Sequence, residues 1–78
     1  MELDDATLER AYAIYRRRFS ILTPNGIREI RERSGLSQRD FGRLLGWDDV
    51  TLHRYETGAL PAIAHNAVLK MLEREGRI

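Results

Sequence analysis

Apolar residues recur three and four positions apart along most of this 78-residue chain, with charged residues between them. This spacing places them on one face of an α-helix, whereas a half-buried strand would alternate at every second position. The chain has no alternating run, and its pattern predicts five helices, near 5–18, 24–34, 38–45, 49–57 and 62–74. The sequence therefore predicts an all-α protein.

Each predicted helix has one apolar face that we expect to be buried. The apolar positions are, in chain order, Leu8, Ala11, Tyr12, Tyr15 and Phe19; Ile27 and Ile30; Phe41, Leu44 and Leu45; Leu52 and Tyr55; and Ala64, Val68, Met71 and Leu72. For the aromatic residues of the first helix, packing in the core or in a dimer explains the pattern better than a ligand site does. We also expect Trp47 to pack, and His65 to pack or cap.

Residues that start and stop helices stand at the predicted bounds. Thr23 precedes the second helix and Ser37 the third, where a hydroxyl can accept hydrogen bonds from the first backbone amides. Gly46 follows the third helix, and glycine adopts without strain the left-handed conformation that ends a helix. Asp48 or Asp49 can then cap the fourth helix. These local signals support the helix bounds.

Residues 36–58 have the organisation of a helix-turn-helix. Two short predicted helices meet at a tight turn at Gly46, and Gly58 closes the second helix. In a helix-turn-helix the second helix enters the major groove of DNA, where base edges present distinct hydrogen-bond donors and acceptors. The polar outer face of the second helix suits that role, so the first hypothesis is a protein that reads DNA.

Two stretches carry a resemblance to a known family. They are Leu36-Ser37-Gln38 through Arg54-Tyr55-Glu56-Thr57-Gly58, and Leu22-Thr23-Pro24 followed by Ile27-Arg28-Glu29-Ile30-Arg31. The first resembles the lambda-repressor-like (Xre-type) helix-turn-helix family. With the second, the chain is similar to the carboxy-terminal DNA-binding domain of MqsA-type antitoxins, which join a zinc finger to a helix-turn-helix.

The resemblance covers about residues 22–73 and implies a domain of four core helices preceded by one extra amino-terminal helix. We accordingly divide the chain into an amino-terminal helix or linker, residues 1–21, and a helix-turn-helix DNA-binding domain, residues 22–75. In the relatives a cysteine-rich zinc domain precedes this point. We therefore expect the chain to be one domain of a longer protein.

The resemblance also implies where DNA would be contacted. The candidate DNA-binding residues are Gln38, Arg39, Arg43, Asp49, Val50, Thr51, His53 and Arg54. Gln38 stands where the family holds a phosphate or braces the recognition helix, and Arg54 where it reaches a guanine or the backbone. Val50 stands at a position where the family often has Asn or Ser. It can contact a thymine methyl group, but it cannot make a bidentate contact to adenine. Asp49 can accept from a cytosine amino group or cap the helix, and we favour the cap.

The charge of the chain is small in total but unevenly distributed. The formal net charge is +1, made up of −4 in residues 1–9, +6 in residues 10–45 and −1 in residues 46–78. Distribution matters more than net charge for affinity to phosphates. The basic block, which holds nine arginines, coincides with helices that would flank DNA in this fold.

The arginines of the basic block have different expected roles, which depend on the helix that carries them. Arg39 and Arg43, on the helix that begins with the candidate residue Gln38, are the better candidates for contacts to the DNA backbone. In the second helix we expect i, i+4 ion pairs, either Glu29 with Arg33 or Arg28 with Glu32. The run 16–18 can contact phosphate or complement the negative end of the first helix dipole, and both interpretations stay open.

The residue inventory argues against an enzyme. The chain has no cysteine, so it has neither disulfides nor thiolate metal ligands. His53 and His65 lack a helical ligand spacing, no serine has a histidine beside it, and no glycine-rich phosphate loop is present. We expect no catalytic residues, no metal and no cofactor. Without a signal peptide or an apolar run of about 20 residues, the expected compartment is the cytoplasm.

Two functions remain open at this point. The first is sequence-specific binding of double-stranded DNA by a transcriptional regulator, a repressor or antitoxin that controls its own promoter. Its recognition helix is about 49–57, and a homodimer would read a palindromic operator with half-sites about 34 Å apart. A toxin protein is a further expected partner, through parts outside this chain.

The second function is a protein–protein interaction domain with a degenerate helix-turn-helix. Asp48, Asp49 and Val50 favour it, because they weaken the face that would read bases. The fold alone cannot choose between the two functions. Substitution of Arg54 distinguishes them, since only the DNA-binding function requires that side chain.

Overall fold

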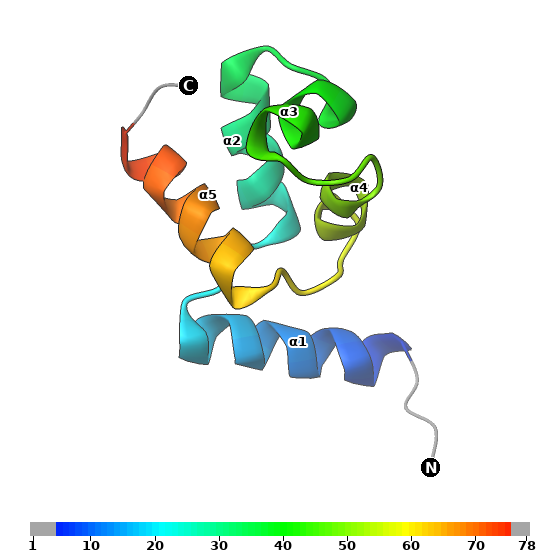
Figure 1. Cartoon of the computed structure of the whole chain (residues 1–78). Coiled ribbons are helices and arrows are strands. Elements are labelled where there is room, and N and C mark those ends of the chain that lie inside the picture. The colour runs from blue at the N-terminus through cyan, green and yellow to red at the C-terminus, as the bar shows by residue number, and fades with distance from the viewer. Residues whose placement is uncertain (1–4, 76–78) are drawn as a thin grey trace.

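A computed structural model of the chain describes residues 5–75, all of whose regular structure is helical (Figure 1). The helices are α1 (Asp5–Phe19), α2 (Pro24–Ser34), α3 (Gln38–Leu45), α4 (Thr51–Glu56) and α5 (Ile63–Glu75). The predicted all-α class is confirmed. Residues 1–4 of the acidic amino-terminal segment, where the division 1–21 begins, lie outside the described residues.

The predicted caps of α2 and α3 are confirmed. Thr23 Oγ1 accepts a hydrogen bond from the amide of Gly26 at 3.0 Å, and Ser37 Oγ accepts one from the amide of Asp40 at 3.1 Å. Gly46 ends α3 with a φ of 80°, in the left-handed region that favours glycine. The chain therefore enters and leaves α3 at positions that local sequence determines.

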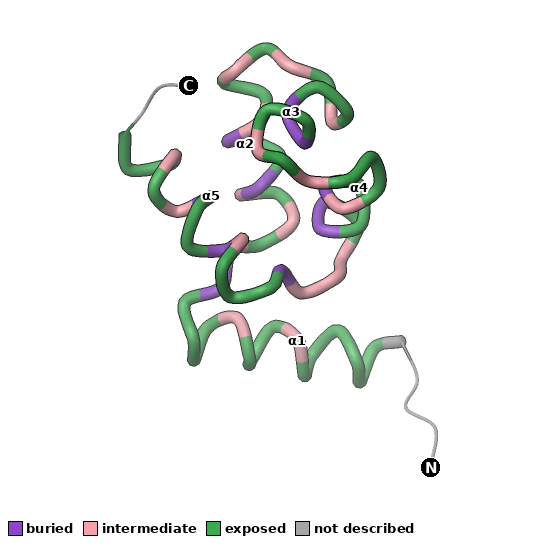
Figure 2. Tube along the Cα trace, in the orientation of Figure 1, coloured by how far each residue is buried: buried purple, intermediate pink, exposed green. Residues whose placement is uncertain are grey.

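The core lies among α2, α3, α4 and α5. Its buried side chains are Ile27, Ile30, Phe41, Leu52, Tyr55 and Leu69. Figure 2 shows the buried segments of these helices turned toward one another. Leu44, which we expected inside with Phe41, is exposed instead. Because α3 is short and packs through one side, Phe41 and Leu45 fill the space that the other helices leave.

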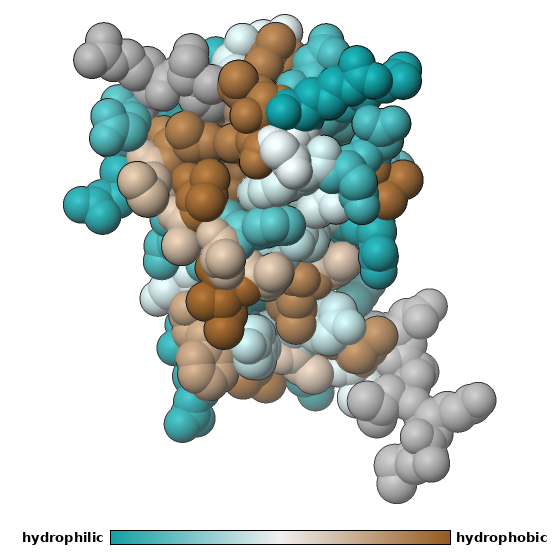
Figure 3. Space-filling model, viewed as in Figure 1, coloured by the Kyte–Doolittle hydropathy of each residue, from teal (hydrophilic) through white to brown (hydrophobic). Residues whose placement is uncertain are grey.

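The prediction for the buried face of α5 is largely wrong. Three residues that we expected inside are exposed: Ala64, Val68 and Met71. The core takes Leu69, while the side chain of buried Asn66 accepts a hydrogen bond from the amide of Leu22 at 2.9 Å. Helix α5 has apolar residues on more than one face, so spacing alone could not identify the packed one. Figure 3 shows apolar side chains gathered on the surface over α5.

Helix α1 lies beside the other four helices rather than among them (Figure 1). No closely packed pair of helices within residues 5–75 includes α1. Polar contacts attach it: Arg16 Nη2 donates to the carbonyl of Gly58 at 2.9 Å, and Lys70 Nζ donates to the carbonyl of Ser20 at 3.0 Å. Asn66 Nδ2 donates to the same Ser20 oxygen at 3.3 Å. One of the arginines in the run 16–18 thus serves an internal contact.

The apolar face of α1 does not enter the core. Leu8, Tyr15 and Phe19 are exposed, and the rings of Tyr15 and Phe19 lie 4.8 Å apart on the surface. The expectation of core packing for these residues is therefore wrong within this chain. The physical reason is that α2 to α5 already close a core among themselves. Packing in a dimer stays a prediction.

Candidate nucleic-acid interface

The turn between α3 and α4 is built around the carboxylate of Asp48. Its Oδ1 accepts hydrogen bonds from the amides of Val50 at 3.2 Å and Thr51 at 2.9 Å, and from the Thr51 hydroxyl. The Thr51 hydroxyl and these amides hold the pKa of Asp48 below its usual value. Because this side chain closes the turn, α4 begins at Thr51 rather than near 49 and ends at Glu56. The predicted recognition helix, 49–57, is therefore too long.

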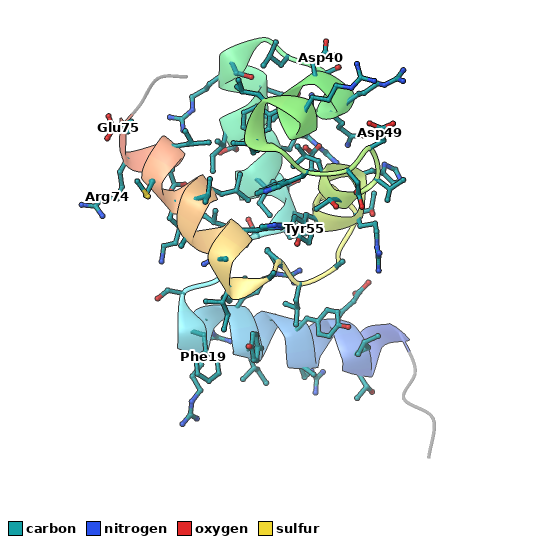
Figure 4. The ribbon with its side chains drawn as sticks, viewed as in Figure 1. Phe19, Asp40, Asp49, Tyr55, Arg74 and Glu75 are labelled. Carbon is teal, nitrogen blue, oxygen red and sulfur yellow. The ribbon has the colours of Figure 1, made fainter. Side chains whose placement is uncertain are left out.

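Asp49 has a different role from Asp48. Its carboxylate oxygens lie 4.0 Å from Nε of Arg39 and 4.0 Å from Nε of Arg43, both on α3. Of the two acids that we expected to cap this helix, Asp48 binds the amides and Asp49 does not, so the favoured interpretation of Asp49 as a cap is wrong. The side chain of Asp49 is 59 % exposed, and the two arginines are exposed as well. Figure 4 shows Asp49 on the same side of the molecule as Asp40 of α3.

The remaining candidate residues lie along the outer side of α4. Val50, His53 and Arg54 are exposed, and Thr51, whose hydroxyl donates to Asp48, is half-buried. Next to them is an open pocket of about 300 Å³, lined by Thr51, Arg54, Tyr55, Ala59, Leu60 and Ala62. Six of the eight candidates are exposed on α3, the turn and α4, whereas Gln38 and Thr51 are half-buried.

Gln38 braces α4 from beneath through Glu56. The Glu56 side chain is 0 % exposed. Arg31 binds it with two hydrogen bonds, from Nε at 2.7 Å and Nη2 at 3.0 Å, and Gln38 Nε2 adds a third at 3.1 Å. The resemblance allowed two roles for Gln38, a contact to a phosphate or a brace for the recognition helix. In this structure Gln38 braces α4. This network ties α2 and α3 to the last residue of α4.

The ionisation of Glu56 follows from these partners. Burial alone would raise its pKa, but the hydrogen bonds from Arg31 and Gln38 outweigh it and the pKa is lowered. The pKa of Arg31 is raised by its bond to Glu56. Both groups are therefore charged, and a charge pair inside a protein is stable only when its hydrogen bonds are satisfied.

The sequence contains a signal for this network that the predicted helix faces did not include. Arg31 follows Ile27 by four positions, and Glu56 follows Leu52 by four positions, so each charge falls on an apolar stripe. The expected pair of Arg28 with Glu32 is also wrong. Arg28 Nε instead lies 3.5 Å from Oε1 of the buried Glu56 side chain.

Aromatic side chains of the α3–α4 turn and of α4 contact His65 of α5. The ring of Trp47 stacks on His65 at 4.0 Å between centroids, and the Tyr55 hydroxyl lies 2.8 Å from His65 Nδ1. The amide of Ala62 donates to the same hydroxyl at 3.2 Å. The expected packing of Trp47 and His65 is confirmed. Helix α4 is thus anchored on its inner side while its outer side stays open.

The described residues hold no group of three or more His, Asp or Glu side chains placed to bind a metal ion. None of the helices in residues 5–75 has the length and apolar character needed to cross a membrane.

Comparison with known proteins gives a family. A family model described as a helix-turn-helix domain matches residues 27–74, which run from within α2 to within α5. The comparisons with curated proteins and with solved structures give no match. The match includes all eight candidate residues and leaves α1 outside.

Proposed function

We propose that this chain, which belongs to the helix-turn-helix domain family, binds double-stranded DNA sequence-specifically and regulates transcription. The family assignment indicates DNA binding. The observation that carries the proposal further is the position of α4, whose inner side is fixed by Glu56 and Tyr55 and whose outer side is exposed. A short helix held in this way can enter a major groove without losing its support.

The charges around α4 support the same function. Arg39 and Arg43 on α3 and Arg54 on α4 present exposed guanidinium groups around the turn. Arginine binds phosphates and can also bind guanine edges with two hydrogen bonds. We assign Arg39 and Arg43 to the DNA backbone and Arg54 to a guanine or the backbone. Val50, Thr51 and His53 complete the reading surface.

The proposal also includes a biological role, an oligomeric state and a protein partner. We infer a cytoplasmic repressor, an antitoxin that represses its own promoter, related to the MqsA-type proteins that its motifs resemble. It would act as a homodimer on a palindromic operator with half-sites about 34 Å apart. A toxin would bind through parts of a parent protein outside this chain.

Selection from a randomised duplex pool at two salt concentrations tests the DNA-binding proposal. The native chain should enrich a palindromic sequence, with binding that falls steeply as salt rises. Arg54→Ala should cost about 1–3 kcal/mol of binding and relax the preference at one base pair. The matched control is Arg74→Ala on α5, whose side chain lies on the opposite side from Asp49 in Figure 4. This control should bind like the native chain.

A protein–protein interaction domain is the second candidate. It is favoured by the two carboxylates of Asp48 and Asp49 beside α4, since negative charge near phosphates weakens binding to DNA. If no sequence is enriched, or if Arg54→Ala binds DNA as the native chain does, this second function replaces the first.

A further inference from the structure

The two neighbouring acids of the turn are not equivalent. Asp48 accepts three hydrogen bonds on one oxygen and is committed to the start of α4. Asp49 makes no such bond to the backbone in the described residues. Its contacts are the guanidinium groups of Arg39 and Arg43, each at 4.0 Å. An exposed carboxylate therefore stands at the edge of the proposed reading surface with its oxygens available to a ligand.

The two arginines make this acid compatible with DNA. A lone carboxylate near phosphates would be repelled, but Asp49 lies between two positive charges and the group of three has a net charge of +1. A guanidinium has several N–H donors, so it can face a carboxylate and a phosphate together. Arg39 and Arg43 can thus position Asp49 while they contact the backbone.

The chemistry of a carboxylate limits what Asp49 can recognise. An ionised carboxylate only accepts hydrogen bonds, and the major-groove donors are the amino groups of cytosine and adenine. Guanine and thymine present acceptor oxygens there and would repel it. Adenine has an acceptor nitrogen beside its amino group, whereas cytosine presents the amino group alone. A carboxylate therefore fits cytosine best.

We propose that Asp49 determines specificity by selecting a cytosine in each half-site, with Arg39 and Arg43 as positioning residues that hold its carboxylate. The inference rests on the proposed DNA-binding function and deepens it. One base pair is then selected by Asp49, although its negative charge, taken alone, argues against DNA binding.

The test is selection from a randomised duplex pool with the native chain and Asp49→Asn. The native chain should favour cytosine at one position of each half-site by roughly tenfold. Because an amide can bind adenine with two hydrogen bonds, Asp49→Asn should lose that preference and select adenine at the same position. The matched control is Glu75→Gln, which removes an exposed carboxylate of α5 on the opposite side from Asp49 in Figure 4 and should select the native sequence.

The positioning role has its own readout. Arg39→Ala with Arg43→Ala should weaken the cytosine preference and lower the salt dependence of binding, leaving the preference at other positions unchanged. Lysine at both positions should restore the salt dependence but only part of the cytosine preference, since lysine lacks the planar guanidinium group with its several N–H donors.

The outcomes separate the inference from the function on which it rests. If the native chain selects a sequence and Asp49→Asn selects the same one, Asp49 is not the determinant and the inference fails alone. If the native chain enriches no sequence, the proposed function fails and the inference fails with it. Circular dichroism of each variant checks that the exposed substitutions leave the helices folded.

Discussion

At the scale of single residues, Glu56 shows how one buried charge can position a functional element. Arg31 and Gln38 hold its carboxylate from two other helices, so α4 cannot shift without breaking a satisfied ion pair. Removal of one partner leaves the other charge without compensation, which is costly inside a protein. The residue therefore fixes the position of α4 from inside the protein.

Stability should depend on pH through Glu56. Its pKa is lowered in the folded protein, so its contribution is present above the unfolded value and is lost as pH falls through the folded value. The free energy of unfolding should therefore decrease on acidification below about pH 5. In Glu56→Gln that decrease should be smaller, and at pH 7 the variant should be about 2–3 kcal/mol less stable.

Urea denaturation between pH 7 and pH 3 measures this effect. Glu29→Gln, which removes an exposed carboxylate of α2, is the control and should keep the native pH dependence. Equal pH dependence in the native chain and Glu56→Gln would mean that the buried pair does not couple folding to protonation.

Substitution by alanine should have opposite effects on stability at two glycines near the turn between α3 and α4. Gly46 has a φ of 80° with nothing near a new Cβ, so Gly46→Ala should cost about 1–2 kcal/mol from backbone strain alone. Gly42 lies inside α3, and a Cβ there would meet the Asp48 carbonyl oxygen at 3.5 Å, an ordinary contact. Gly42→Ala should be neutral or gain up to about 1 kcal/mol. Thermal denaturation compares the pair, and a reversed order would contradict the turn geometry.

At the scale of elements, α5 shows that a helix can be apolar on more than one side and still pack through one. Leu69 enters the core, and buried Asn66 holds the segment before α2. The side of α5 that carries Ile63 and Met71 stays at the surface. The packed side of α5 places Leu69 in the core. It also lets Asn66 make hydrogen bonds with Ser20 and Leu22 in the connection between α1 and α2.

The orientation of α5 can be measured with two substitutions to alanine. Leu69 is 0 % exposed, so Leu69→Ala should lower the free energy of unfolding by about 2–5 kcal/mol. Met71 is 61 % exposed, so Met71→Ala should change it by less than about 0.5 kcal/mol. Urea denaturation gives both values. A larger loss for Met71→Ala would mean that α5 packs through the face first expected from the sequence.

At the scale of the whole molecule, the chain consists of a four-helix unit and an attached helix. The family match runs from within α2 to within α5, and α1 joins this unit through polar contacts near Gly58 and Ser20. The Gly58 carbonyl belongs to the loop that follows α4. Helix α1 is therefore linked directly to the loop that connects α4 with α5.

Arg16→Ala should loosen α1 and leave the four-helix unit intact. The guanidinium bond to Gly58 is worth about 1.5–3 kcal/mol, so amides of α1 and of residues 58–61 should exchange with deuterium at least about tenfold faster. Exchange in the core of α2 and α3 should not change. Hydrogen exchange followed by mass spectrometry measures this, with exposed Arg17→Ala as the control. Faster exchange throughout would show that α1 stabilises the whole fold.

The sequence by itself determined what depends on neighbours within a few positions. Thr23, Ser37 and Gly46 set helix bounds because caps and left-handed glycines act through the local backbone. The stripe of Ile27 and Ile30 and that of Leu52 and Tyr55 identified buried faces because each had one apolar side. The motif between residues 36 and 58 likewise indicated the helix-turn-helix.

Only the tertiary structure decided which distant groups meet. Asp48 and Asp49 look equivalent in the sequence, and the direction of the turn assigned one to the helix and the other to the arginines of α3. The partners of Glu56 come from α2 and α3, and the packed side of α5 was chosen by the core. These outcomes follow from packing between segments far apart in the chain, which local spacing does not encode.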